Sequence, residues 1–216
     1  MKVVSKTTND SETSVEVDLF EGRKLPTRIK KRIQDEVGNF LVEQTIILGT
    51  QSKSPVQGAS NFKALTSKEY KLKKQKEVGN TKANLEFSGQ MWDEFDYEPT
   101  DKGVAVGVYG ERAPAADGHN NLSGKSSLPT RRSIPDVGQN YKKDIQKEVE
   151  RIIADVIAEE STFKRKDFIN ITTKKALYDR LATIFGPMSR AELNLAVFRS
   201  EELTNLMKEL DLVGLL

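Results

Sequence analysis

Apolar side chains recur at helical spacing in two long segments, and this constrains the fold more than any other feature of the chain. In the first segment, Ile29, Ile33, Val37 and Leu41 follow Pro26, and basic residues stand between the first of them. A spacing of four places these side chains on one stripe of an α-helix, and proline is favoured at the first helical position. We therefore expect an amphipathic helix of about five turns that begins near residue 26.

The second segment lies at residues 139–160. Its apolar side chains are spaced by four, four, three and four residues, and they are Tyr141, Ile145, Val149, Ile152 and Val156. This spacing also predicts an amphipathic helix, although it covers too few heptads to indicate a coiled coil.

Strand patterns are short and few. Val15, Val17 and Leu19 alternate with acidic residues, and valines alternate with small residues over 104–108. A turn at 99–103 joins the second pattern to another expected strand at 91–97, so a hairpin is predicted there. The expected fold class is α+β, with a small antiparallel sheet flanked by the two long amphipathic helices.

The rest of the chain predicts three regions. Residues 1–14 are polar and are expected to form a flexible N-terminal arm, and residues 15–161 the α+β domain. Residues 110–136 carry breakers without periodicity and are expected to be a long loop. After Ser161, helical patterns near 173–185, 189–197 and 200–211 predict a helical C-terminal extension over 162–216, in which Leu203, Leu206, Met207 and Leu210 share one face.

Composition excludes several classes of protein. The 216 residues include 34 basic and 32 acidic ones, so a net charge of +2 gives no global argument for nucleic-acid binding. The chain has no cysteine and a single histidine, His119, which excludes disulfides, thiolate zinc sites and histidine clusters. No apolar run approaches the roughly 20 residues that span a bilayer, and the N-terminus lacks the apolar core of a signal peptide. A soluble protein that does not enter this export route is expected, with no cofactor, no metal and no membrane partner.

The stretch from Gly118 to Ser126, GHNNLSGKS, is close to a nucleotide-binding P-loop. In that motif four residues separate the two glycines, whereas five separate Gly118 from Gly124. A buried strand should precede the loop and a helix should follow Lys125, and neither pattern is present. We therefore expect no nucleotide binding. No other catalytic motif is recognisable, and the acidic run Asp93–Asp101 lacks the spacing of a calcium loop. The chain is not expected to be an enzyme.

A basic helix is expected over residues 66–77, with an N-cap at Thr66-Ser67 and an acid, Glu69, in its first turn. Its five lysines are the densest positive patch in the chain, and they are Lys68, Lys71, Lys73, Lys74 and Lys76. Two interpretations remain open: a solvated helix surface, or a nucleic-acid-binding module in which these lysines contact phosphates.

A series of motifs follows in order along residues 25–160. After the first helix come Phe62-x-x-Leu65 with Tyr70, the lysine-rich helix, and Leu85-x-x-Ser88-Gly89-x-Met91. A valine strand, a loop from His119 through Gly124 to Pro129-x-Arg131, and the second long helix complete the series. In this order the chain resembles the virion-morphogenesis or tail-completion proteins of tailed bacteriophages, which sit at the head–tail junction and share an α+β fold with tail-terminator proteins.

The resemblance implies a structural virion protein of the neck or tail, made in the host bacterial cytoplasm. It implies a ring of identical subunits, most often six, that joins the connector to the tail tube and lets double-stranded DNA pass without sequence-specific contact. An acidic hairpin beside the lumen would repel phosphate, which is a physical role for Asp93, Glu94, Asp96 and Glu98. For His119 we expect a hydrogen bond to loop backbone. The chain departs from the family where Asn120 replaces a glutamine, where Ile134-Pro135 replaces an aromatic residue, and in its last 55 or so residues.

Overall fold

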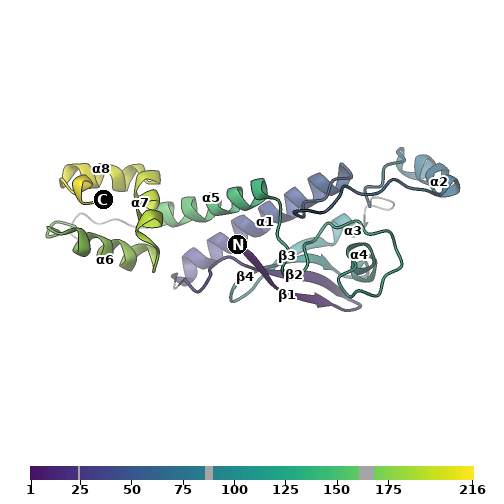
Figure 1. The fold of residues 1–216 in the computed structure, drawn as a ribbon, viewed down its shortest axis with the longest axis horizontal. Coiled ribbons are helices and arrows are strands. Elements are labelled where there is room, and N and C mark those ends of the chain that lie inside the picture. Colours follow the sequence, from purple (N-terminus) through teal and green to yellow (C-terminus); the bar gives the residue numbers. More distant parts are fainter. Residues whose placement is uncertain (24, 86–89, 161–167) are drawn as a thin grey trace. The chain divides into compact units, whose positions relative to one another are not determined.

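The computed structural model describes residues 1–23, 25–85, 90–160 and 168–216 (Figure 1). The chain divides into two compact units. Unit 1 comprises Met1–Glu21 and Gln34–Val149, and unit 2 comprises Gly22–Ile33 and Glu150–Leu216. The division falls within two long helices, α1 (Thr27–Thr50) and α5 (Lys143–Glu160), which confirm the two helices expected from apolar spacing.

Unit 1 is built on an antiparallel sheet with the strand order β1-β2-β4-β3 (Figure 1). Its strands are β1 (Lys2–Thr8), β2 (Glu12–Asp18), β3 (Phe95–Pro99) and β4 (Gly103–Tyr109). Val106 on β4 stands opposite Val15 on β2 and Tyr97 on β3, so these three side chains share one face. We call this the inner face. The expected α+β class with a small antiparallel sheet is confirmed.

The inner face is covered by α1, whose glycines allow close approach. A Cβ atom on Gly38 would lie 2.3 Å from the ring of Tyr97, and one on Gly49 would lie 2.4 Å from the ring of Trp92. Gln34 adds polar anchors, because its Nε2 donates to the carbonyls of Thr100 (2.6 Å) and Gly103 (2.8 Å). The helix therefore packs against the hairpin turn at residues 100–103 as well as against the valines of the inner face.

A further helix, α4 (Ala113–Asn120), packs on the same face and is a correction to the sequence prediction. It lies inside the segment 110–136 that we expected to be loop throughout. Its small residues Ala113 and Ala116 are fully buried, and the Thr13 hydroxyl donates to the Ala113 carbonyl (2.7 Å). Alanine, glycine and proline in this helix gave no apolar periodicity, so packing on the sheet decides the conformation here.

The N-terminal arm was also predicted wrongly. Residues 2–8 form β1, which pairs antiparallel with β2 along its length, and Val3 is 1% exposed. The segment is polar because β1 is an edge strand whose side chains are mostly exposed. The hairpin prediction needs a smaller correction, since residues 90–93 form a short helix, α3 (Gln90–Asp93), and only 95–99 form the strand.

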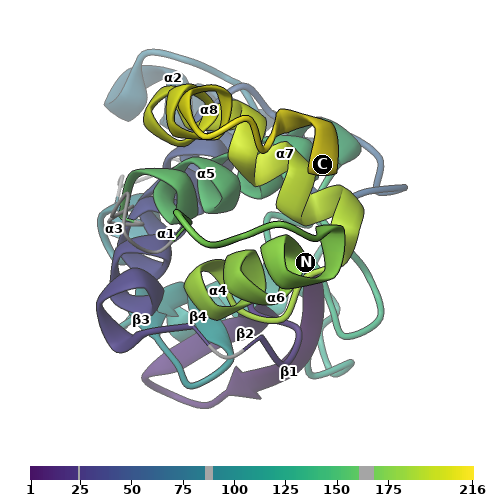
Figure 2. The same ribbon diagram turned by 90° about the vertical axis from the view of Figure 1, so that its left-hand side faces the viewer.

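Unit 2 contains the C-terminal helices at the expected places. They are α6 (Lys174–Phe185), α7 (Arg190–Arg199) and α8 (Glu201–Glu209), followed by a 3-10 turn at Val213–Leu215. Figure 2 shows α7 between α6 and α8. Ser189 begins α7 in a capping box with Glu192, and Arg23 pairs with the same glutamate at 3.0 Å.

The boundary of this unit differs from the expected one at residues 161 and 162. The apolar stripe of α5 continues through Ile153, Val156 and Ile157, and these side chains belong to the core of unit 2. Arg32 of α1 and Glu159 of α5 form an ion pair within the same unit. The change of composition at Ser161 therefore does not mark the division, because helix stripes bury apolar surface on both sides of it.

Candidate functional site

The loop between α4 and α5 is organised around the buried side chain of Asn120. Its Oδ1 accepts hydrogen bonds from the backbone N–H groups of Ser133 (2.7 Å) and Ile134 (2.8 Å). Its Nδ2 donates to the carbonyl of Ala116 (2.9 Å) and lies 3.1 Å from the Ser133 hydroxyl. One amide therefore joins the last turn of α4 to the far end of the loop.

His119 and Arg131, both named by the resemblance, meet beside this amide. The backbone N–H of Arg131 donates to the carbonyl of His119 (2.8 Å), and its Nη1 lies 3.4 Å from His119 Nδ1. Burial, with a smaller effect of the Arg131 charge, lowers the pKa of His119 to about 4 against the opposing hydrogen bond with the Pro129 carbonyl. The ring is thus neutral at pH 7, donating to the carbonyl and accepting from the guanidinium, as expected for a histidine bound to loop backbone.

Arg131 itself is 8% exposed, and its Nε atom has no hydrogen-bond partner among the described residues. Burial lowers its pKa. Within the described ranges its guanidinium lies beside the neutral imidazole of His119 and the phenol of Tyr70 and forms no ion pair, so the site holds a positive charge at the base of the loop. His119, Pro129 and Arg131 are therefore brought together, whereas Gly124 stands apart in a left-handed turn with φ +72°.

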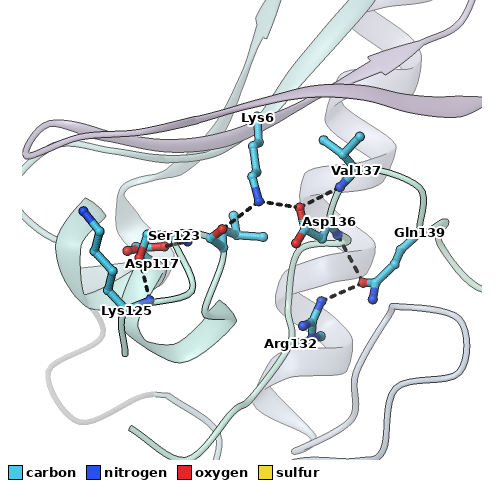
Figure 3. A network of polar contacts seen from close by, with 9 residues as sticks. Lys6, Asp117, Ser123, Lys125, Arg132, Asp136, Val137 and Gln139 are labelled. Carbon is cyan, nitrogen blue, oxygen red and sulfur yellow. Dashed lines mark hydrogen bonds and ion pairs between the residues drawn. The ribbon is translucent and has the colours of Figure 1, made fainter. Parts of the chain in front are cut away.

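Lys6 of β1 holds the other side of the loop (Figure 3). Its Nζ donates to the Leu122 carbonyl (2.7 Å) and pairs with Asp136 at 2.9 Å. Gln139 then accepts from the Asp136 backbone N–H (3.2 Å) and from Arg132 Nη1 (2.8 Å). This chain of contacts fixes the loop between the sheet and the start of α5.

The geometry around Lys125 differs from that of a P-loop. Gly118 and His119 belong to the last turn of α4, so the carbonyl end of a helix, which carries partial negative charge, points at this loop. No helix follows until α5, and every residue between them is described. Lys125 contributes its backbone N–H to the Ser123 hydroxyl at 3.4 Å, and its side chain is exposed (Figure 3).

The earlier family motifs lie in the core of unit 1 or at its margin. Phe62 and Met91 are buried, and Leu65 is half-buried. Leu85 adopts a left-handed backbone with φ 59°. Ser88 and Gly89 lie outside the described residues. Packing in the core accounts for Phe62 and Met91.

The basic helix is confirmed as α2 (Lys68–Val78), and Ser67 caps it by accepting from Tyr70 N–H (3.2 Å). Only Lys74 of this helix is buried, and its ammonium donates to the carbonyl of Lys82 and to Asn84 Oδ1. Leu72 is 66% exposed and Tyr70 41% exposed. The helix therefore exposes two apolar or aromatic side chains among its lysines.

The four acidic residues of the expected lumen hairpin separate into different environments. Glu94 has a structural role, since its Oε2 accepts from the Arg112 backbone N–H (2.7 Å) at the start of α4. Asp93 is exposed at the end of α3. Asp96 and Glu98 are exposed on β3, on the face of the sheet opposite Tyr97.

The second face of the sheet, which we call the outer face, carries acidic residues from two strands, β2 and β3, that are far apart in the sequence. Strand register places small residues and Tyr109 at its centre and carboxylates on both flanks. The flanking residues are Glu12, Glu16 and Asp18 on β2, and Asp96 and Glu98 on β3. Burial raises the pKa of Tyr109 and the charges of Glu98, Glu12 and Asp96 raise it further, against a hydrogen bond with Ser14.

The carboxylates of the outer face are not neutralised. Their side-chain hydrogen bonds come from neutral groups, as in Ser14 to Glu12 (2.6 Å) and Ser5 to Glu16 (2.8 Å). Within the described part of the chain, none of the five forms an ion pair. The face therefore carries five carboxylates without an ion pair among the described residues, and Lys2 of β1 stands opposite Asp18 at one end of it.

The described residues hold no cluster of three or more histidine and acidic side chains suited to a metal. Over the same ranges, every helix is too short or too polar to cross a bilayer. Comparisons with known protein families, with curated protein sequences and with solved structures gave no match to this chain.

Sequence reasoning missed the roles of three residues that organise the site: Asn120, Lys6 and Glu94, the last of which was expected beside a lumen. Asn120 was noted only as a departure from the family pattern, and Lys6 lay in the expected flexible arm. A usable signal was present for Asn120, because a short amide beside small residues is suited to buried loop bonding. No sequence signal indicated the roles of Lys6 and Glu94, since their partners are distant in sequence or are backbone groups.

Proposed function

We propose that this chain is a structural virion protein of a tailed bacteriophage, located at the head–tail junction as a ring of identical subunits between connector and tail. The observation that carries the proposal is the order of the family motifs, together with the meeting of His119, Pro129 and Arg131 in one folded loop. A motif whose members contact one another behaves as a structural unit, as the resemblance requires.

The surfaces of unit 1 support assembly. A sheet with one packed face and one charged face, and a helix with exposed Leu72 and Tyr70, both offer area to other subunits. Two different patches on one chain form a heterologous contact, and such contacts close into rings when the rotation permits. The proposed neighbours are other copies of the chain, with connector and tail-tube proteins above and below.

Two measurements test this function. The full chain should sediment as a closed oligomer, and negative-stain electron microscopy should show rings, of six subunits if the resemblance extends to ring size. Gold-labelled antibody against the chain should mark the head–tail junction of particles from the virus that encodes it. A chain that stays monomeric at all concentrations, or label on the capsid wall or tail tip, contradicts the proposal.

Nucleic-acid binding is the second candidate, and exposed lysines favour it. Lys68, Lys73 and Lys76 of α2 are exposed, as are the nearby Lys63 and Lys82. Binding through several phosphate contacts would weaken steeply as salt rises from about 50 to 200 mM. A salt-dependent affinity for duplex DNA that is lost on Lys68→Glu with Lys76→Glu, in a chain that remains monomeric, would favour this function over the ring.

A further inference from the structure

Two surfaces of unit 1 are complementary in charge and in spacing. The first is a row on α2 formed by Lys68, Leu72 and Lys76. These residues are four apart and share one side of the helix, and Leu72 and Lys76 lie roughly opposite the buried Lys74. Neither lysine forms an ion pair within the described ranges. We call these three residues the α2 row.

The second surface is a row across the outer face. Ala105 at the centre of β4 is paired in register with Glu16 on β2 and with Glu98 on β3. The next position along β4 is Gly107, between Ser14 and Asp96. The ring of Tyr109 lies along this part of β4, because its hydroxyl donates to the Ala105 carbonyl (3.0 Å), and carboxylates border Ala105 on both sides. We call Glu16, Ala105 and Glu98 the sheet row.

The two rows match in length. A helix rises about 1.5 Å per residue, so Lys68 and Lys76 are about 12 Å apart along α2. Neighbouring strands are about 4.8 Å apart, so Glu16 and Glu98, two strands apart, are separated by about 10 Å. Each row has its small or apolar residue in the middle, so Leu72 would lie over Ala105 while each lysine reached one glutamate.

We propose that the α2 row of one copy of this chain docks on the sheet row of the next copy, forming the subunit contact of the ring. The inference rests on the proposed ring function. It commits to a second copy because the complementary surface is present on the same chain. An exposed leucine between the lysines also has nothing to gain from a phosphate backbone, whereas Ala105 and the neighbouring Tyr109 ring would bury it. Asp96 and Glu98 then border a subunit interface and do not line a lumen.

Charge reversal tests the contact. Lys68→Glu with Lys76→Glu should weaken self-association at least tenfold, measured by sedimentation velocity over a concentration series. Glu16→Lys with Glu98→Lys should do the same. Combining the four substitutions in one chain should restore association, because the pairs re-form with opposite signs. A matched control is Lys63→Glu with Lys125→Glu, which changes net charge equally at exposed positions outside the row and should leave the mass unchanged.

The outcomes separate this contact from the ring itself. A wild-type oligomer that neither reversal affects, or reversals that the fourfold variant does not rescue, overturn the contact and leave the ring standing. A wild-type chain that is monomeric throughout overturns both. If reversal of the α2 row abolishes binding to duplex DNA and leaves the oligomer intact, the row is a nucleic-acid surface and the proposal is wrong. Circular dichroism of each variant should match wild type, since every substituted side chain is at the surface.

Discussion

At the scale of single residues, unit 1 depends on polar side chains that satisfy buried backbone. Asn120 is 0% exposed, and its side chain accepts hydrogen bonds from two backbone N–H groups and donates one to a carbonyl. Glu94 accepts a hydrogen bond from the backbone N–H of Arg112. A buried donor left without its partner costs about 1–3 kcal/mol, so such residues matter more for stability than their size suggests.

Replacing Asn120 with alanine should therefore lower the free energy of unfolding by about 3 kcal/mol, since it strands the N–H groups of Ser133 and Ile134. Urea unfolding followed by circular dichroism measures this. Asn61→Ala, at an exposed loop position, serves as the control and should change stability by about 0.5 kcal/mol or less. Equal effects of the two substitutions would show that the Asn120 side chain contributes no more to stability than an exposed loop side chain does.

His119 should titrate with a midpoint near pH 4 in the folded chain. It is the only histidine, so its ring resonances in a proton NMR titration are unambiguous. The folded pKa lies below the unfolded value of about 6.5, so the unfolded state binds more protons between these values and stability falls as pH drops through that window. The loss due to this group from pH 7 to pH 5 is expected to be about 1–2 kcal/mol and to be absent in His119→Gln. A midpoint near 6.5 would contradict the buried, neutral ring.

At the scale of elements, the two edges of the sheet differ. On β3 the alternate hydrogen bonding to β4 directs the backbone nitrogens of Tyr97 and Pro99 away from β4, toward the open edge of the sheet. Asp96 Oδ1 accepts the Tyr97 N–H (2.8 Å), and proline has no N–H to offer, so this edge is protected against further pairing. On β1 the protection comes from a bulge between Val3 and Ser5 and from exposed polar side chains.

The strand assignment of β1 gives the third prediction. Val3→Ala should destabilise the chain by about 2 kcal/mol, because it removes a fully buried side chain from the inner face. Thr7→Ala, on the exposed side of the same strand, is the matched control and should cost about 0.5 kcal/mol or less. Thermal unfolding of both variants checks this. If residues 1–14 formed a flexible arm, neither substitution would change the unfolding temperature.

In the molecule as a whole, each of the two units is made of two segments that are separate in the sequence. Unit 2 joins a short segment before the middle of α1 to everything after the first turns of α5. Residues 162–216 are therefore only part of a unit whose core also includes Ile29, Ile33 and Ile153.

A chain truncated after residue 161 should expose these three isoleucines together with Val156 and Ile157. We expect it to self-associate non-specifically or to lose helix at the two exposed ends, while the sheet of unit 1 keeps a cooperative transition. Size-exclusion chromatography and circular dichroism measure both effects against the full chain. A truncated chain as soluble and as helical per residue as the full chain would show that 162–216 is a detachable extension.

Local spacing and capping account for the features that are predicted correctly from the sequence. Both long helices, the capped basic helix α2, the valine strand β4 and the α+β class follow from periodicity and turn chemistry within windows of a few residues. The resemblance to a known family, and not periodicity, singled out His119, Pro129 and Arg131, which the fold brings together.

Packing in three dimensions sets the features whose partners cannot be recognised from a local pattern of residue types. β1 is a strand because β2 supplies its hydrogen bonds, and α4 is a helix because Ala113 and Ala116 fit against the sheet. The Asn120 side chain joins α4 to the end of the loop because the chain folds back and brings the Ser133 backbone N–H to it. The outer face exists because register places Glu16 and Glu98 on either side of Ala105. Each of these depends on a tertiary contact whose free energy outweighs weak local preference, and a local pattern of residue types does not show which contact is made.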